Sequence, residues 1–166
     1  MKSANLPKPD RRDRLLRENV HDPYQTRLKL AAPAACLECG AVYQKGGWQW
    51  GLRSEAAAEV VCPACQRIRD DYPAGIVRLV GTAYLARHGE AIRNLVRNIE
   101  TADKERHPLQ RVMAIEDTDD GMTVTTTDLH LPRRIGQALR RAHKGRLDVH
   151  YDEEGYFIRI DWQAPT

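Results

Sequence analysis

The residues of this 166-residue chain with the clearest chemistry are its four cysteines, which form two Cys-x-x-Cys pairs. The first motif contains Cys36 and Cys39, the second contains Cys62 and Cys65, and 22 residues separate the two motifs. Four thiolates are the ligand set of closed, structural zinc sites. The spacing is close to that of a zinc ribbon, in which two tight turns each present two sulfurs. The sequence therefore predicts one Zn²⁺ held by these four residues, with no open coordination position for catalysis.

Disulfides and redox-active dithiols are the alternative uses of such cysteines. Disulfides persist in oxidising compartments. Residues 1–10 carry charge but lack the apolar run of a signal peptide. Charged residues interrupt every apolar stretch before it reaches the length of a membrane span. We therefore expect a cytoplasmic protein without a membrane segment, in which metal-bound thiolates are favoured over both alternatives.

The charge of the chain is concentrated near its N-terminus. Residues 1–35 contain eight Lys or Arg and four Asp or Glu, a net charge of +4, although the whole chain carries only +3. A basic arm on a near-neutral body is typical of proteins that contact phosphate groups. We expect residues 1–35 to become ordered on a partner, with RNA contacts from Arg11, Arg12, Arg14 and Arg17.

Residues 36–72 contain both cysteine pairs and form the expected zinc ribbon. Between the pairs, Gly46 and Gly47 predict a hairpin turn flanked by two short strands. Trp48 and Trp50 then share one face of the second strand. Large aromatic side chains mostly bury area, which favours a role in a small core. A base-stacking surface is the alternative role.

Residues 75–162 alternate between strand-like and helix-like patterns in the order β-α-β-β-α-β-β. This order predicts an α+β domain in which both helices cover one face of an antiparallel sheet. A ferredoxin-like sandwich with one added strand is the expected architecture. We expect strands at 75–85, 112–117, 122–127, 147–151 and 156–162, with helices at about 88–104 and directly after Asp128.

The second predicted helix has an unusual charge pattern. Residues 129–147 contain six Lys or Arg and no acidic residue. Asp128 can cap the helix, and Leu131, Ile135 and Leu139 recur at helical spacing on one side. Exposed helix faces usually mix both signs of charge, so a face of one sign favours phosphate binding over simple solvation. The expected RNA contacts on this face are Arg133, Arg134, Arg140, Arg141 and Lys144.

Catalytic patterns are weak in this sequence. The histidines are scattered and form no recognised hydrolase, metalloprotease or phosphate-loop motif. Asp128 and His130 lie close in sequence, but strand propensity followed by a helix cap explains them without catalysis. We therefore expect no enzymatic activity and no small-molecule substrate.

Four stretches together resemble a group of small bacterial zinc-ribbon proteins. They are CLECGAVYQKGGWQW, CPACQRIRDDYPAG, HPL at 107–109 and TTTDLHLPRRIGQAL, and the resemblance extends from His21 to Trp162. That group is similar to the N-terminal part of the NMD-three adaptor, which escorts the large ribosomal subunit in archaea and eukaryotes. The adaptor has further cysteine pairs and further domains, whereas this sequence contains a single set of four cysteines.

The resemblance implies a protein that faces the ribosome. It also implies that the four cysteines are zinc ligands and that the surface around Arg133, Arg134, Arg140 and Arg141 makes contacts. We therefore expect a non-enzymatic factor that binds rRNA on the large subunit or the whole ribosome, in maturation or in stress-related silencing (hibernation). The alternatives are a protein–protein adaptor without direct RNA binding, and a thiol-based enzyme or redox switch.

Overall fold

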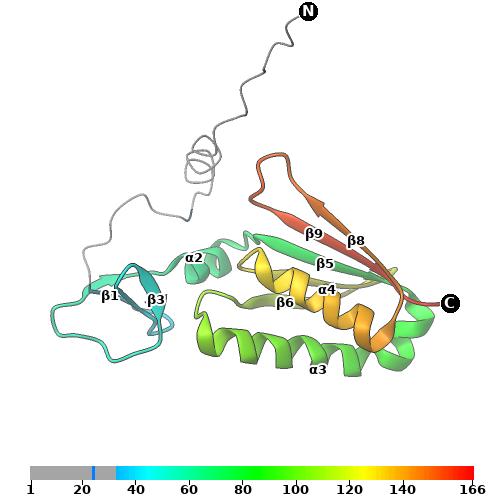
Figure 1. Ribbon diagram of the computed structural model, residues 1–166, viewed down its shortest axis with the longest axis horizontal. Coiled ribbons are helices and arrows are strands. Elements are labelled where there is room, and N and C mark those ends of the chain that lie inside the picture. Colours follow the sequence, from blue (N-terminus) through cyan, green and yellow to red (C-terminus); the bar gives the residue numbers. More distant parts are fainter. Residues whose placement is uncertain (1–23, 25–32) are drawn as a thin grey trace, which may run out of the picture.

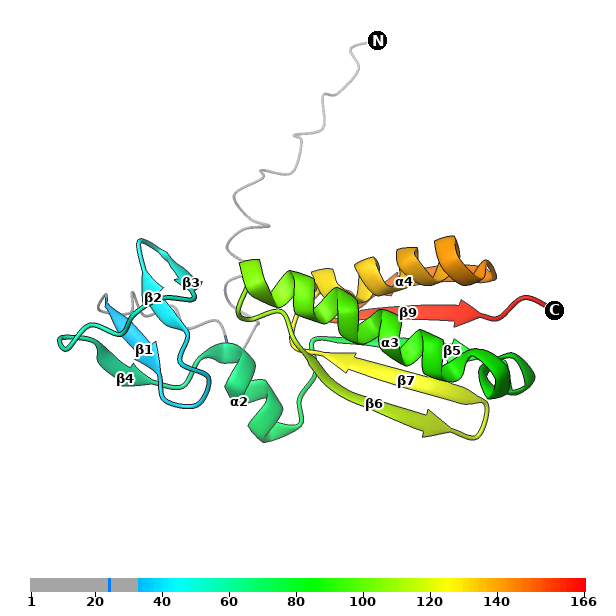
Figure 2. The same cartoon turned by 90° about the horizontal axis from the view of Figure 1, so that it is seen from below.

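The computed structural model describes residue 24 and residues 33–166, and within them it contains two sheets and three helices (Figure 1). The smaller sheet lies at one end of the molecule, next to a short helix, and the larger sheet carries the two long helices (Figure 2). The chain is therefore a mixed α+β protein, as predicted, with the cysteine pairs in its N-terminal part.

The smaller sheet has four three-residue strands in the order β3-β2-β1-β4. The strands are β1 (Ala34–Cys36), β2 (Val42–Gln44), β3 (Gly47–Gln49) and β4 (Ala58–Val60). Gln44 pairs with Gly47, so Lys45 and Gly46 form the turn, one residue earlier than predicted. Both turn residues have positive φ, 53° and 80°, as a type I′ hairpin requires.

Helix α2 (Pro63–Asp70) connects the small sheet to the large one. Cys62 is its N-cap residue and Pro63 occupies the first turn, where a missing N–H costs nothing. The helix ends at Asp71, which adopts the left-handed conformation with φ 49°. Because Cys62 and Cys65 lie at its start, this helix orients the second cysteine pair.

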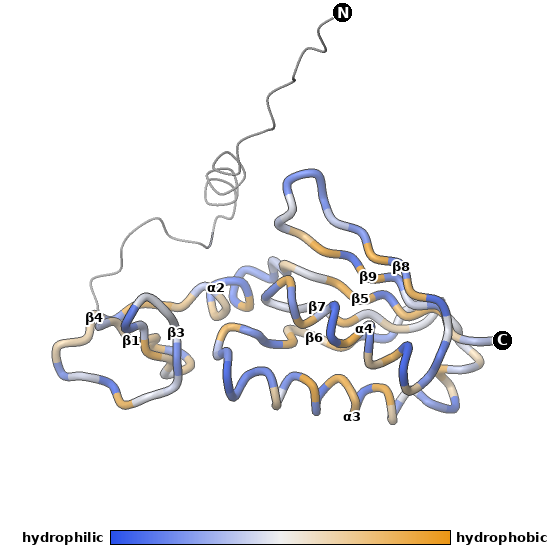
Figure 3. Tube along the Cα trace, viewed as in Figure 1, coloured by the Kyte–Doolittle hydropathy of each residue, from blue (hydrophilic) through white to orange (hydrophobic). Residues whose placement is uncertain are grey.

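The larger sheet has five strands in the order β6-β7-β5-β9-β8. Helices α3 (Thr82–Arg106) and α4 (His130–His143) cover the same face of it. The buried core between them is aliphatic apart from Met122 and Trp162. Along α3, hydrophobic and hydrophilic residues alternate (Figure 3). The strands are β5 (Gly75–Val80), β6 (Val112–Thr118), β7 (Gly121–Thr126), β8 (Arg146–Tyr151) and β9 (Ile158–Gln163).

The strand order departs from the predicted antiparallel arrangement. β5, β6 and β7 pair as a split β-α-β unit requires, but β9 lies beside β5 and runs parallel to it. β9 therefore separates β8 from β5 and leaves β8 at the edge. The physical reason is burial: Ile158, Ile160 and Trp162 of β9 are completely buried, so this strand gains more from an inner position than β8 does.

The first predicted strand also ends earlier than expected. β5 stops at Val80, and α3 begins at Thr82 rather than at about 88. Gly81 makes this change of direction with φ 137°, and a Cβ there would lie 2.6 Å from the Cβ of Ala164. The alternation of apolar and polar residues that predicted a strand as far as residue 85 continues into the first turn of α3. There, tertiary packing overrides the local preference for a strand.

Candidate metal centre

The four cysteine sulfurs converge at the junction of the small sheet and α2. Their Sγ atoms lie within 4.8 Å of one another, and no disulfide joins them. Cys36 ends β1, Cys39 lies in the following turn, and Cys62 and Cys65 lie at the start of α2. Segments 22 residues apart in sequence thus supply one cluster that is placed to hold a metal ion.

Backbone amides surround these sulfurs. The N–H of Cys62 donates to Cys36 Sγ at 3.3 Å, and the N–H of Cys65 donates to Cys62 Sγ at 3.4 Å. The first turn closes through a bond from the Gly40 N–H to the Cys36 carbonyl at 3.1 Å, with Gly40 at φ 78°. Such amide donors stabilise thiolates and fix their direction toward a metal.

The thiols differ in how their surroundings affect ionisation. Burial raises the pKa of Cys62 and of Cys65. Burial acts in the same direction at Cys36, but hydrogen bonds from the backbone and the side chains of Cys39 and Cys62 together outweigh it and lower the pKa of Cys36. A metal ion favours the thiolate form in all four positions, because only the thiolate is a ligand.

Arg111 belongs to the candidate site, although no sequence pattern marks it. It lies between α3 and β6, its side chain is buried, and its guanidinium donates to Cys62 Sγ at 3.2 Å and to Cys65 Sγ at 3.4 Å. Its Nε donates to the Pro108 carbonyl at 2.9 Å, which fixes its direction. Burial lowers the pKa of Arg111, but the hydrogen bond to Cys65 and the charges of the neighbouring cysteine sulfurs together outweigh burial and raise the pKa. The larger domain therefore supplies a charged partner to the sulfur cluster.

Two tryptophans connect the ribbon with its surroundings in different ways. Trp48 packs on the cysteine cluster and meets the Tyr43 ring edge-on at 5.5 Å. Trp50 is 39% exposed, and its Nε1 donates to the Lys104 carbonyl at the end of α3 at 2.7 Å. Trp48 thus belongs to a small core, whereas Trp50 joins the ribbon to the larger domain.

The predicted basic face of α4 is present as one exposed surface. Arg133, Arg140 and Lys144 are exposed, and so are Arg134 and Arg141. The guanidinium of Arg134 forms an ion pair with Asp103 of α3, whose own side chain is buried. The other predicted RNA contacts, Arg11, Arg12, Arg14 and Arg17, lie outside the described residues.

A hollow of about 310 Å³ lies between α3 and α4 at this basic face. Arg134, Gln137 and Arg141 supply its polar groups, and Ile99 and Ala138 supply its apolar groups. The hollow thus offers the guanidinium of Arg141, the amide of Gln137 and the guanidinium of Arg134, which also pairs with Asp103. These groups are hydrogen-bond donors for an anion.

Asp128 and His130 have a structural role. The Asp128 carboxylate accepts from the N–H of His130 at 2.9 Å and from that of Leu131 at 3.2 Å. It therefore caps α4, as the sequence predicts. Burial raises the pKa of Asp128 even though these bonds act in the opposite direction.

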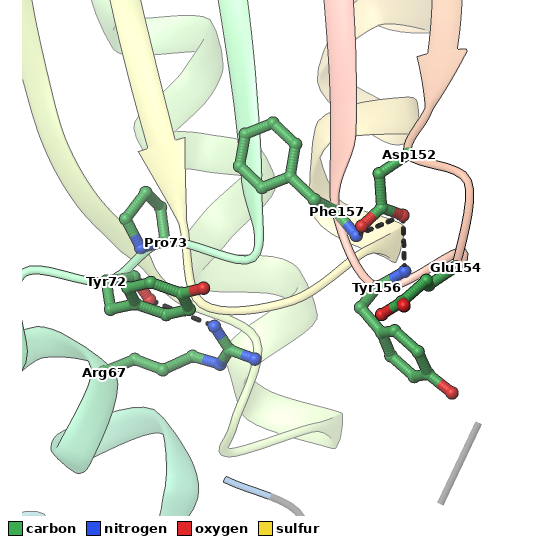
Figure 4. Close-up of a pocket in the computed structure, with 7 residues that line it drawn as sticks. All are labelled: Arg67, Tyr72, Pro73, Asp152, Glu154, Tyr156 and Phe157. Carbon is green, nitrogen blue, oxygen red and sulfur yellow. Dashed lines mark hydrogen bonds between the residues drawn. The ribbon is translucent and has the colours of Figure 1, made fainter. Parts of the chain in front are cut away.

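Another hollow, of about 290 Å³, lies between α2 and the β8–β9 turn (Figure 4). The buried Arg67 borders it, donates to the Tyr72 carbonyl at 3.0 Å, and lies 4.5 Å from the centre of the Tyr24 ring. The Tyr24 hydroxyl donates to Asp70 at 2.8 Å. Across the hollow, Asp152 accepts from two backbone N–H groups of its own turn. The contacts with Arg67 and Asp70 attach Tyr24 to α2.

Comparison of the chain with protein-family models, curated proteins and solved structures finds no match. Within the described residues, no helix combines the length and the apolar character that crossing a membrane requires.

Proposed function

We propose that the chain is a zinc-containing, non-enzymatic RNA-binding factor that associates with ribosomal RNA in the cytoplasm. The observation that carries the RNA part is the exposed face of α4, where five basic side chains gather in a segment without acidic residues. A face of one charge sign attracts the phosphate backbone.

The donor set supports zinc as the metal. A tetrahedral zinc ion with sulfur ligands at about 2.3 Å requires sulfurs about 3.8 Å apart. The Sγ atoms of Cys39 and Cys62 lie 3.7 Å apart. Cys36, Cys39, Cys62 and Cys65 would hold the ion, and it would supply folding energy to the ribbon rather than chemistry.

The ribosome enters the proposal through the sequence resemblance to bacterial zinc-ribbon proteins that are similar to the NMD-three adaptor, which escorts the large ribosomal subunit. The large subunit or the whole ribosome is the proposed partner, in maturation or in hibernation. Residues 1–35, with their net charge of +4, would add further phosphate contacts.

The test is sedimentation of a cell lysate through sucrose gradients, with detection of the chain in each fraction. We expect the chain to move with ribosomal particles at low salt and to dissociate as salt rises, because phosphate contacts depend on released counterions. If the chain stays at the top of the gradient at low salt, in growing and in starved cells alike, the ribosome proposal fails.

A protein–protein adaptor is the second candidate. Leu52 is 96% exposed and Leu37 is 57% exposed, and both lie in the ribbon. Each leucine could bury its exposed apolar area against a partner protein. An RNA pull-down across a range of salt concentrations separates the candidates, because only the RNA-binding factor is captured in a salt-dependent way.

A further inference from the structure

The edge strand β8 carries an apolar row on the same side of the sheet as the helices. Leu147, Val149 and Tyr151 pair directly with Trp162, Ile160 and Ile158. Directly paired residues share a face, and these three partners belong to the buried core beneath the helices. The row of β8 therefore points toward the helix side, beside α4.

Helix α4 covers only the first member of this row. A Cβ at Gly136 would lie 3.1 Å from Leu147 and 3.0 Å from Ile160, so α4 approaches the sheet closely there. Farther along β8, Val149 is 46% exposed and Tyr151 is 52% exposed. The edge strand thus leaves about half of an aliphatic and of an aromatic residue exposed to solvent.

The flank of α4 that faces β8 is basic. Residues three or four positions from Gly136 lie on its side of the helix, and these include the exposed Arg133 and Arg140. On the opposite flank, Arg134 and Arg141 border the hollow between α3 and α4. Basic side chains therefore lie on both flanks of α4, one flank beside the exposed part of β8 and the other beside the hollow.

The acidic residue of β8 does not interrupt this surface. Asp148 alternates with Val149 and points to the other face of the sheet, where its carboxylate pairs with Arg146 at 3.0 Å. His150 lies on that other face as well, 3.3 Å from Asp161. The helix-side surface therefore combines arginines with an exposed tyrosine and valine.

We propose that this surface binds single-stranded RNA, with an unpaired base on Tyr151 and Val149 and the adjoining phosphates at Arg133 and Arg140. A further phosphate occupies the hollow beside Arg134 and Arg141. Aromatic side chains that stack bases, next to cations that hold the backbone, are the common means of binding single strands. A base inside a duplex is already stacked and cannot reach Tyr151. The inference rests on the proposed RNA-binding function and adds the form of RNA that is bound.

The test compares the affinity of the chain for a single-stranded oligoribonucleotide of about twelve nucleotides with its affinity for the same strand annealed to its complement. Fluorescence anisotropy measures both affinities across salt concentrations. Tyr151→Ala should weaken single-strand binding about ten-fold and leave the salt slope unchanged, because stacking releases no counterions. Tyr151→Phe should restore binding. His150→Ala, on the other face of the same strand, is the matched control and should bind as the unmodified chain does.

A combined Arg133→Gln and Arg140→Gln variant should instead flatten the salt slope, by about 0.7 for each single-strand phosphate that is no longer neutralised. Thermal unfolding of each variant checks that its fold is retained. If the duplex binds as tightly as the single strand, or if Tyr151→Ala binds normally, this inference is wrong while the RNA-binding function stands. If the unmodified chain binds neither RNA, both fail.

A second copy of the chain, paired along the edge of β8, is the alternative occupant of this surface. Sedimentation of the free protein tests for it. The inference expects the unmodified chain and Tyr151→Ala to have the same mass in solution. A dimer that Tyr151→Ala dissociates would overturn the RNA assignment of this surface.

Discussion

At the scale of single residues, the sulfur cluster depends on a cation from outside the ribbon. Four thiolates around a divalent metal carry an excess of two negative charges, and burying such charge is costly unless it is compensated. Arg111 places a buried guanidinium on two of the sulfurs, and its backbone N–H donates to Thr127 at 3.0 Å. It therefore acts as a positioning residue that couples the metal ligands to the larger domain.

Replacing Arg111 should weaken metal binding without removing a ligand. Arg111→Gln loses the positive charge on Cys62 and Cys65, and we expect metal affinity to fall by about 10- to 100-fold. Competition with a chromophoric chelator measures the change. Arg106→Gln, at an exposed position at the end of α3, is the matched control. Equal affinities in the two variants would contradict a role for Arg111 at the metal.

Replacing a ligand should have a larger effect. Cys39→Ser or Cys62→Ser should abolish stoichiometric zinc and unfold residues 36–72, because metal binding contributes on the order of 10 kcal/mol of folding energy in such sites. Elemental analysis gives the metal content, and hydrogen exchange shows whether the ribbon amides lose protection. An unmodified, untagged chain that contains no zinc would end the metal proposal.

At the scale of elements, α4 is amphipathic in the way its sequence predicts. Leu131, Ile135 and Leu139 are completely buried, and the basic residues lie on the exposed side. Asp128 satisfies N–H groups at its start. The element can therefore change its surface charge without losing its core packing.

Charge reversal on α4 tests the RNA-binding role of that element. Arg133→Glu, Arg140→Glu and Lys144→Glu together should leave the fold intact but reduce RNA affinity and flatten its salt dependence, by about 0.7 to 0.9 for each phosphate that is no longer neutralised. Filter binding across salt concentrations measures both quantities. The control is reversal of three exposed arginines of α3, Arg87, Arg97 and Arg106. If both triple variants lose affinity equally, the effect is one of net charge and not of α4.

The last turn of α4 should make stability depend on pH. His143 accepts or donates a hydrogen bond with the Tyr84 hydroxyl at 2.9 Å, and its ring lies 6.0 Å from that of His88. Burial, and then the charge of His88, lowers the pKa of His143 below 6.5. The unfolded chain thus binds a proton more readily, and the free energy of unfolding should fall as pH decreases through 6.5.

Urea unfolding at a series of pH values measures this dependence. His143→Gln should flatten the profile around that pH, whereas His107→Gln, at an exposed position after α3, should leave it unchanged. Parallel profiles for the unmodified chain and for His143→Gln would contradict the assignment.

At the scale of the whole molecule, the ribbon joins the larger domain through several contacts. Arg111 reaches the sulfurs, and Trp50 donates to the end of α3. Leu109 also packs against the cysteine cluster. A metal ion at the cysteine cluster would therefore stabilise a junction as well as a small domain.

Deletion of the N-terminal residues tests whether they contribute to ribosome binding by the whole molecule. Deleting residues 1–20 should weaken co-sedimentation with ribosomes, since it removes six of the chain's basic residues and their phosphate contacts. The melting temperature should stay the same, because both hydrophobic clusters are built from residues 36 to 164. A lower melting temperature would mean that this segment contributes to the fold, and unchanged sedimentation would mean that it makes no ribosome contact.

Much of the architecture could be predicted from local patterns. Donor type and spacing identify the four cysteines, and hydrophobic periodicity identifies α4 and its basic face. These features depend on residues close in sequence, where covalent geometry sets which side chains share a face. The same reasoning places the Asp128 cap correctly.

Tertiary structure alone decides the features that depend on competition between distant segments. Both strands of the last hairpin alternate, but only one can lie beside β5, and the greater apolar area of Ile158, Ile160 and Trp162 gives β9 that place. The exposure of Tyr151 at the sheet edge follows from this choice. Likewise, no local pattern marks Arg111, because its contact with Cys62 joins residues 49 positions apart. Such contacts exist only once the chain has folded, since they depend on which surfaces meet rather than on the order of residues.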